Sequence, residues 1–229
     1  LTIDAADLSG KDVNGLKGGS IVVSLDDTAG LNFAPVDIET GGTFTATVTS
    51  DVTLAADTVL GSLSVGVTSG DTLTLLASQA TGKTITGDGS VLITDADPTT
   101  VYNFANINMG TGTATLKFSS GGILAGGTNL TGIEAIQTAG TDTLTLTATQ
   151  AGSRTLTNTG TTDEMVIVVD WKDDLSAAGL NLSVPTRYDL TLDKDGGGAG
   201  LGSSVTMTDA QHNGAGTVTA AGTADEVTF

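Results

Sequence analysis

Aspartate side chains in two short loop segments are the groups of this sequence best suited to chemistry. The segment DWKDD carries Asp170, Asp173 and Asp174, and the segment DKDG carries Asp193 and Asp195. Asp is short, tolerates turn conformations and offers the hard carboxylate oxygen that calcium prefers in loops. The spacing therefore predicts that these five carboxylates bind calcium. The alternative is that they form solvated turns of an acidic chain.

Groups suited to catalysis are scarce. His212 is the only histidine, and it lies in the turn segment AQHNGAG. The carboxylate pairs Asp163-Glu164 and Asp225-Glu226 fall at equivalent points of two sequence repeats, which indicates a structural corner. The sequence contains no phosphate-loop, HExxH or GxSxG fingerprint. We therefore predict no enzyme activity, and the alternative is a carbohydrate-active β-solenoid enzyme that uses Asp163 and Glu164.

Charge and composition exclude several classes of partner. The chain has 229 residues, eight Lys and Arg, 26 Asp and Glu, a formal net charge of −18 and no Cys. Nucleic-acid binding needs clustered basic residues, and an anionic membrane surface repels an acidic chain. Without Cys there is no disulfide framework and no zinc–thiolate site. Because no apolar segment reaches the ~20 residues of a membrane helix, we predict no membrane insertion.

Strand periodicity extends over almost the whole sequence. The segments TFTATVT (43–49), TLTLL (72–76) and DTLTLTAT (142–149) alternate apolar residues with Thr. Period two is typical of a half-buried strand, and β-branched Thr favours the pleated backbone while its hydroxyl faces water. The predicted fold class is all-β. Aromatic residues make up only 3% of the chain, so we expect a thin core of Val, Leu, Ile, Ala and Thr methyl groups.

Four segments repeat a common pattern, at 1–23, 73–94, 144–168 and 205–227. In the second and third copies, Gln79 aligns with Gln150 at an offset of 71 residues. Each copy has an alternating strand, a short polar corner, a Gly-containing turn and a second strand. Such a unit cannot bury its apolar face alone, so neighbouring units must stack on it. At the matched turns, Lys83 and Arg154 are expected to pair with nearby carboxylates.

Two architectures fit these repeats, an elongated β-solenoid or a series of tandem β-sandwich modules. Sandwich modules usually carry a central aromatic anchor and a proline-marked junction, and neither recurs regularly in this sequence. The β-solenoid is therefore favoured. We expect residues 1–229 to form one elongated repeat region. The start at Leu1 instead of Met indicates a mature product or a fragment of a longer chain.

One part of the sequence resembles a known family. NLTGIEAI (129–136) followed by GTDTLTLTATQA (140–151) is similar to repeats of bacterial surface-layer (S-layer) proteins and of RTX-like proteins exported by type I secretion. The resemblance implies export from a Gram-negative cell, calcium-assisted folding outside it, and a role in a surface lattice or as a long adhesin. The family's tandem calcium-binding nonapeptide GGxGxDxxx is absent, and DKDGGGAG (193–200) is the nearest segment. A calcium-loaded β-roll is therefore not expected.

The residues and the resemblance together predict a secreted, non-enzymatic structural protein of the bacterial cell surface, a segment of an S-layer lattice. The expected partners are further copies of the chain or neighbouring surface-protein subunits, with surface glycan or lipopolysaccharide as further candidates. Calcium is the expected cofactor. The alternative is an adhesin stalk or tip module that binds glycan, ice or another surface.

Overall fold

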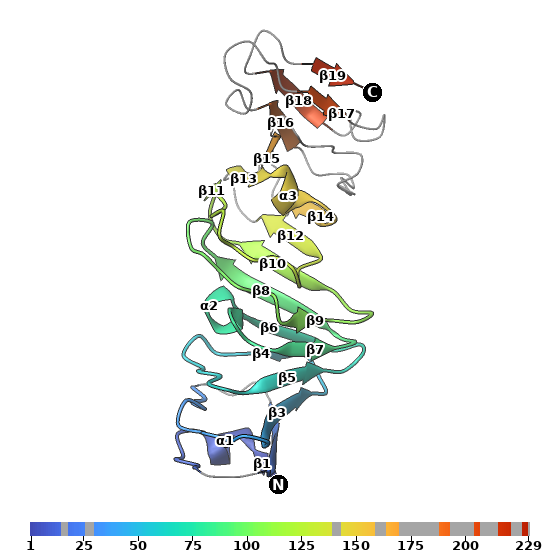
Figure 1. Cartoon of the computed structure of the whole chain (residues 1–229). Coiled ribbons are helices and arrows are strands. Elements are labelled where there is room, and N and C mark those ends of the chain that lie inside the picture. The colour runs from blue at the N-terminus through green and yellow to red at the C-terminus, as the bar shows by residue number, and fades with distance from the viewer. Residues whose placement is uncertain are drawn as a thin grey trace. The chain divides into compact units, whose positions relative to one another are not determined.

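The computed structural model describes residues 1–14, 18–25, 30–138, 143–158, 164–169, 188–192, 204–206, 215–220 and 226–228. Strands make up most of the regular structure of these residues, and three helices of four residues interrupt them (Figure 1). The helices are α1 (Ala5–Leu8), α2 (Ala77–Ala80) and α3 (Ala148–Ala151).

The strands form three large sheets and one small one. The first sheet has the order β1-β2-β3-β5-β7-β9, with strands β1 (Thr2–Asp4), β2 (Ser20–Ser24), β3 (Thr43–Val48), β5 (Ser64–Val67), β7 (Ile85–Gly87) and β9 (Ile107–Asn108). The second has the order β14-β12-β10-β8-β6-β4, with strands β4 (Val52–Thr53), β6 (Thr72–Leu76), β8 (Ser90–Ala96), β10 (Ala114–Phe118), β12 (Ala135–Thr138) and β14 (Thr155–Asn158). The third has the order β11-β13-β15-β16-β18, with strands β11 (Gly122–Ile123), β13 (Thr143–Thr147), β15 (Glu164–Val169), β16 (Tyr188–Leu192) and β18 (Ala215–Ala220). A two-stranded sheet pairs β17 (Ser204–Thr206) with β19 (Glu226–Thr228).

Strand pairing identifies the architecture. Neighbouring strands run parallel, and each lies about one coil of the chain away from its partner, as when Val22 lies opposite Thr45 and Leu73 opposite Val91. A tandem sandwich would instead pair consecutive strands in antiparallel fashion through hairpins. The structure is a β-solenoid of about seven turns. This confirms the predicted all-β class and the preference for a solenoid over a sandwich.

The chain divides into two compact units. The first comprises Leu1–Asp95, Tyr102–Leu116 and Asn129–Ile133, and the second comprises Ala96–Val101, Lys117–Thr128 and Glu134–Phe229. The first unit holds the whole first sheet with α1 and α2, and the second holds α3 and the whole third sheet. The extent of the repeat region, 1–229, stays a prediction.

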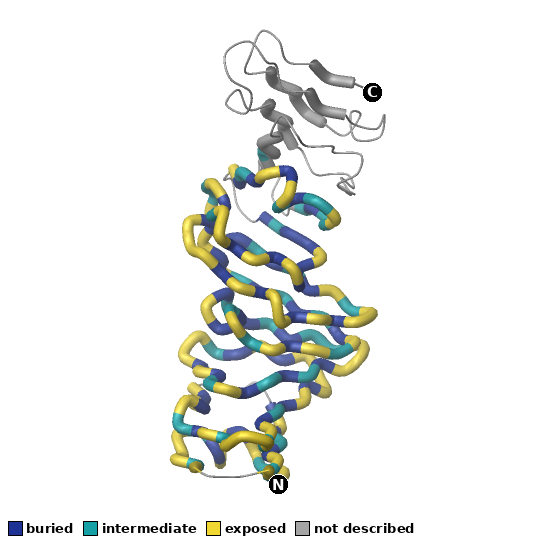
Figure 2. The backbone as a smooth tube through the Cα atoms, viewed as in Figure 1, coloured by how far each residue is buried: buried dark blue, intermediate teal, exposed yellow. Residues whose placement is uncertain are grey.

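Alternation along each strand separates the core from the surface. In β3 the side chains of Phe44, Ala46 and Val48 are buried, whereas the intervening Thr residues are exposed or half-buried. In β6 the buried positions are Leu73 and Leu75. Buried residues line the inside of the coils in both strands and corners (Figure 2). Apolar burial between stacked coils thus stabilises the fold, and Thr residues occupy many of the solvent-facing positions of the strands.

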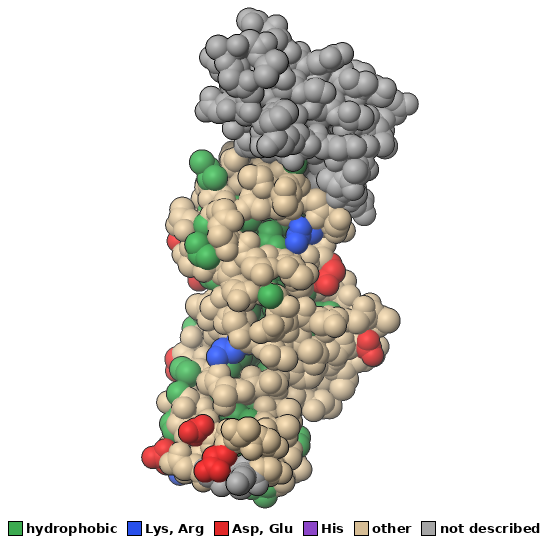
Figure 3. Space-filling model, in the orientation of Figure 1, with side chains coloured by type: hydrophobic (Ala, Val, Ile, Leu, Met, Phe, Trp, Pro, Cys, Tyr) green, Lys and Arg blue, Asp and Glu red, His purple; other side chains and the backbone are tan. Residues whose placement is uncertain are grey.

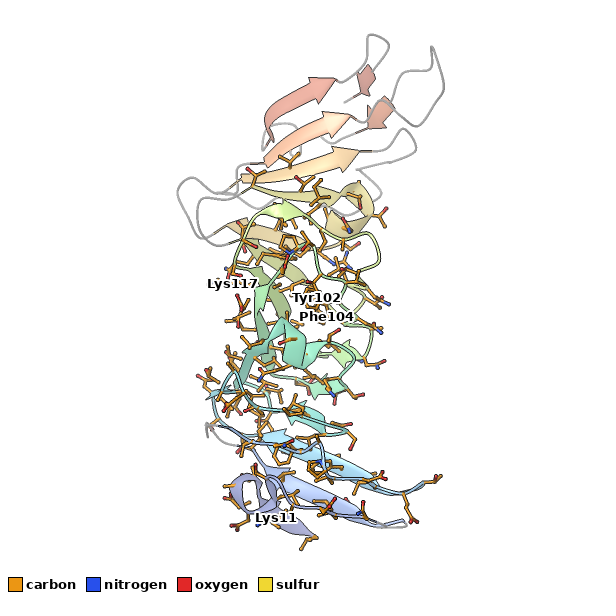
Figure 4. The ribbon with its side chains drawn as sticks, turned by 90° about the vertical axis from the view of Figure 1, so that its left-hand side faces the viewer. Lys11, Tyr102, Phe104 and Lys117 are labelled. Carbon is orange, nitrogen blue, oxygen red and sulfur yellow. The ribbon has the colours of Figure 1, made fainter. Side chains whose placement is uncertain are left out.

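Aromatic residues contribute more to this core than composition predicts. Phe33, Phe104 and Phe118 are almost completely buried, and Phe44 is 5% exposed. The Phe33 and Phe44 rings meet edge to face with centroids 5.7 Å apart. Tyr102 and Phe104 stack at 5.6 Å, and both are labelled in Figure 4. The expectation of a core built only from aliphatic residues and Thr methyl groups was therefore wrong, because four Phe side chains are buried in strands and corners alike.

Candidate functional site

The polar corners of the coils hold residues that the sequence repeats align, among them Gln79 with Gln150 and Lys83 with Arg154. Each helix directly follows a strand, α1 after β1, α2 after β6 and α3 after β13. All three end in the same way, because the backbone N–H after the helix donates to the carbonyl of its first residue. These bonds are Ser9 N to Ala5 O at 3.0 Å, Thr81 N to Ala77 O at 3.1 Å and Gly152 N to Ala148 O at 2.8 Å. Three of the four predicted repeats therefore share one corner, and the corner of the fourth, at 205–227, lies outside the described residues.

Gln79 holds the α2 corner onto the preceding coil. Its side-chain oxygen accepts the backbone N–H of Leu76 at 2.9 Å. Its amide nitrogen donates to the carbonyl of Ala55 at 2.7 Å and to that of Thr58 at 3.0 Å. Gln79 is only 8% exposed, and both ends of its amide bond to backbone groups, which satisfies this nearly buried polar side chain. This Gln is a structural clamp between coils.

Gln150 repeats the arrangement at the α3 corner. Its side-chain oxygen accepts the N–H of Thr147 at 2.9 Å, and its amide nitrogen donates to the carbonyls of Leu124 and Ala125, each at 3.3 Å. Thr147 also accepts the N–H of Gln150 through its hydroxyl at 3.2 Å, which completes a capping box. Leu76 has no side-chain acceptor, so the α2 corner forms only the Gln half of that box. The match of Gln79 with Gln150 in the sequence is thus a match of structure.

A left-handed residue and a cation follow each helix. Gly10, Gly82 and Ser153 have φ values of 70°, 71° and 58°, and the next residues are Lys11, Lys83 and Arg154. The Lys83 ammonium donates to the Gly61 carbonyl of the preceding coil. The Arg154 guanidinium donates to Gln150 O at 3.1 Å and to Gly152 O at 2.8 Å.

These cations bond mainly to the backbone. For Lys83 the expected carboxylate partner is replaced by a carbonyl oxygen. Burial lowers the pKa of the Arg154 guanidinium, and the charge of Glu134 raises it, so a carboxylate does act on Arg154. Arg154 therefore offers donors to carbonyl groups left over where α3 stops, whereas Lys83 ties the α2 corner to the carbonyl of Gly61 on the preceding coil.

Asn-Phe-Ala segments form a second kind of corner, which was not predicted from the sequence. The side chain of Asn32 accepts the N–H of Ala34 at 3.0 Å, and Asn103 accepts that of Ala105 at 3.1 Å. The same corners bond to the helix corner one coil earlier. Gly10 N donates to Asn32 O and Gly82 N to Asn103 O, both at 2.7 Å, while Asn32 N donates to Ser9 Oγ at 2.8 Å and Asn103 N to Thr81 Oγ1 at 2.9 Å.

The third corner closes a unit of three coils. Residues 54–60 (LAADTVL) and 124–130 (LAGGTNL) are the segments whose carbonyls accept the amides of Gln79 and Gln150. Gly61 and Gly132 follow them, and an added Cβ would lie 2.4 Å from Phe33 O at Gly61 and 2.6 Å from Phe104 O at Gly132. Helix corner, Asn-Phe-Ala corner and Leu-Ala corner thus recur in the same order. The signal available in the sequence was NFA at 32–34 and 103–105, again 71 residues apart.

Carboxylates of the described coils serve as hydrogen-bond acceptors at turns. Asp51 accepts the N–H of Thr72 at 2.9 Å, one coil further along. Asp97 accepts both the hydroxyl and the N–H of Thr99 at 2.8 Å. The side-chain and backbone hydrogen bonds from Thr99 lower the pKa of Asp97 from its ordinary 3.8. The acidity of these coils is therefore partly structural, because anionic acceptors hold turn N–H groups.

The five aspartates predicted to bind calcium, Asp170, Asp173, Asp174, Asp193 and Asp195, lie outside the described residues. Across the segments that the structure does describe, no group of three or more His, Asp or Glu side chains is arranged to hold a metal ion. The calcium prediction therefore stays a prediction about those loops.

The candidate catalytic groups are distributed in the same way. His212, Asp163 and Asp225 lie outside the described residues, whereas Glu164 and Glu226 begin strands β15 and β19. The carboxylate pairing proposed for an enzyme therefore stays untested. In the described part of the chain, no helix is long and apolar enough to cross a membrane.

The outward side of the first sheet is uncharged from β2 to β9, and we call it the neutral face. Strand register places Val22, Thr45 and Ser64 in one outward column. The neutral face consists of Ser20, Val22, Ser24, Thr43, Thr45, Thr47, Ser64, Gly66, Thr84, Thr86, Asn106 and Asn108, all exposed or half-buried on β2, β3, β5, β7 and β9 or at their ends. None of these residues is charged, although the chain carries a net charge of −18. In the view of Figure 3, several acidic side chains gather near the N-terminal end, and others lie singly along the edges of the described part.

In comparisons with known proteins, no family model, no curated protein and no solved structure matches the chain.

Proposed function

We propose that this chain is a non-enzymatic structural segment of a secreted bacterial cell-surface protein, part of an S-layer lattice. The observation that carries the proposal is the three-coil unit. Its recurring polar groups, Gln79 and Gln150 above all, form hydrogen bonds between coils. The same corner forms the same hydrogen bonds to the preceding coil in each unit, as expected of a structural scaffold built from stacked repeats. In such a scaffold each repeat contacts only its neighbours.

The lattice proposal is tested by electron microscopy of the purified chain with and without millimolar calcium. Ordered two-dimensional arrays that appear on addition of calcium support it. Single particles under all conditions, at concentrations at which S-layer subunits assemble, contradict it and favour the adhesin alternative. Binding to glycan-coated surfaces or to purified lipopolysaccharide then becomes the deciding measurement for an adhesin.

Calcium is proposed as the cofactor of the loops at 170–174 and 193–195. A net charge of −18 gives the folded chain a self-repulsion that a divalent cation relieves. Isothermal titration calorimetry with the D170N/D173N/D174N and D193N/D195N variants locates the site. The variant that lacks the binding carboxylates should show no heat of calcium binding. An unchanged titration in both variants contradicts the assignment to these loops. Magnesium is the control for nonspecific screening.

A further inference from the structure

The neutral face stands out because charge is missing from it. Thr45 on β3 lies between Val22 on β2 and Ser64 on β5, and neither neighbour in the column is charged. A second column leads from Ser24 through Thr47 to Gly66 and on to Thr86 and Asn108, again without charge. The first charged side chain reached on this sheet is Asp4 on the edge strand β1, opposite Ser24.

The second sheet provides the contrast within the same fold. Its strand β8 carries Asp95, and its strand β10 carries Lys117, which is labelled in Figure 4. Charge therefore interrupts the outward side of that sheet but not the outward side of the first sheet from β2 to β9. In a chain with 34 charged residues among 229, five successive strands without an outward charge distinguish this surface from the second sheet.

We propose that the neutral face is the surface through which two copies of this chain contact each other side by side. The inference rests on the proposed structural function and names the contact that a lattice of this chain would use. The net charge of the chain is the reason for choosing a second copy as the partner. Another copy carries the same charge of −18, so two copies repel wherever acidic side chains approach within a Debye length of about 8 Å. The neutral face lets them approach without bringing like charges together.

The chemistry of the face suits such a contact. Each Thr offers a methyl group and a hydroxyl that both donates and accepts, so two identical Thr arrays can satisfy each other. Within one copy, the Thr43 hydroxyl already donates to the Ser20 hydroxyl at 2.8 Å, so pairs of hydroxyls do bond on this face. The hydroxyls of Thr45, Thr47 and Thr86 therefore exchange water for partner hydroxyls at little cost.

The size of the face sets the strength of the contact. Five strands about 4.8 Å apart and about 16 Å wide present roughly 400 Å² per copy. Stable interfaces bury about 800 Å² per partner, so one neutral-face contact is weak on its own. Weak contacts become effective when many copies are held in an array or when a chain repeats the face, because later contacts are then intramolecular.

Acidic residues beside the face restrict how the copies are oriented. Asp51, Asp71 and Asp88 follow the C-terminal ends of β3, β5 and β7, so they form a row along one side of the face. Copies with parallel strands would bring the two rows together. A twofold axis along the stack of coils makes the facing strands antiparallel and keeps the two acidic rows on opposite sides of the interface.

Disulfide trapping tests the contact directly, because the chain has no Cys of its own. Thr45→Cys and Ser64→Cys place a thiol at the centre of the neutral face, and Thr74→Cys places one on the outward side of β6 in the second sheet as the matched control. Under mild oxidation, we expect the two neutral-face variants to form covalent dimers about tenfold faster than the control, because the contact raises the effective thiol concentration. Equal rates in all three variants would overturn the proposal.

A charge variant separates this inference from the proposed function. Thr45→Asp adds a like charge to the face, and Thr74→Asp adds the same charge elsewhere; circular dichroism melting of both checks the fold. We expect Thr45→Asp, but not Thr74→Asp, to abolish concentration-dependent self-association in sedimentation velocity.

Arrays that still form with Thr45→Asp would overturn the neutral-face contact and leave the lattice intact. Dimer trapping without arrays would keep the contact and contradict the lattice. A monomer that binds ice or insoluble polysaccharide, and loses that binding with Thr45→Asp, would assign the face to another occupant and overturn the inference.

Discussion

The corners at α2 and α3 share one backbone arrangement, although several of their side chains differ. At the start of the helix, Leu76 of the first corner is replaced by Thr147 of the second, which adds a hydroxyl cap. After the helix, Gly82 is replaced by Ser153 at nearly the same positive φ. The Gln amide and its two carbonyl acceptors are retained in both. The difference shows that the corner is defined by bonds between coils and only loosely by the side chains around them.

The largest expected effect concerns the order of corners. Deletion of residues 72–142 removes a whole three-coil unit and places Gln150 where Gln79 meets the carbonyls of residues 54–60. Deletion of residues 73–90 removes a single coil and places an Asn-Phe-Ala corner there instead. We expect the first variant to melt cooperatively and the second to lose its fold, as measured by circular dichroism and size-exclusion chromatography. Equal behaviour of the two deletions would show that the three-coil unit has no structural meaning.

Glycine tests the close approach between the second and third corners. An added Cβ meets Phe33 O at Gly61 and meets Phe104 O at Gly132, and a backbone carbonyl has little room to move. Gly61→Ala and Gly132→Ala should each lower the free energy of unfolding by about 2–4 kcal/mol. Gly126→Ala is the control, because nothing lies within 4 Å of its added Cβ. Urea denaturation measures all three, and a control as unstable as the other two would contradict the argument.

Truncation of the two glutamines compares the clamps themselves. Gln79→Ala leaves the carbonyls of Ala55 and Thr58 without their side-chain donor, so we expect a loss of about 1–3 kcal/mol. Gln150→Ala should cost less, because its amide bonds are 3.3 Å long instead of 2.7 Å and 3.0 Å. Ser78→Ala, at an exposed position of α2, is the matched control. If Ser78→Ala lowers the melting temperature as much as Gln79→Ala does, Gln79 is not a specific clamp.

Backbone conformation after the helix has a smaller effect. Gly82 has φ +71° and nothing within 4 Å of an added Cβ, so a substitution there probes conformation alone. Gly82→Ala should lower the free energy of unfolding by about 1 kcal/mol, and Gly82→Asn by less, because Asn tolerates the left-handed region better. Chemical denaturation of the pair measures the difference. Equal losses would point to an effect other than φ.

The smallest effect concerns the titration of Asp97. Hydrogen bonds from Thr99 lower its pKa below 3.8, so the charged carboxylate favours the folded state. This contribution is present above about pH 3.8 and is lost as the pH falls through the folded pKa. NMR titration should give a midpoint below 3.8 for Asp97, and Thr99→Ala should raise it toward the ordinary value. An unchanged midpoint in Thr99→Ala would contradict the assigned cause.

Much of the fold follows from local sequence patterns. The alternation in TLTLL predicts β6 with Leu73 and Leu75 buried, and the match of Gln79 with Gln150 identifies two equivalent corners. The Asn-Phe-Ala corners were harder to predict. The Asn103 side chain forms a common local turn, but its backbone bonds depend on the coil that contains Thr81 and Gly82. Such bonds depend on which coils are neighbours, and a linear pattern does not specify that.

A repeating unit of three coils also constrains how such a chain can change in length. Neighbouring parallel strands are about 4.8 Å apart, so a unit of three coils adds about 14 Å to a stack. Gain or loss of one or two coils would set unlike corners against each other, whereas gain or loss of a whole unit would preserve every Gln-to-carbonyl bond. Duplication of this sequence in evolution would therefore be tolerated in discrete steps of whole three-coil units.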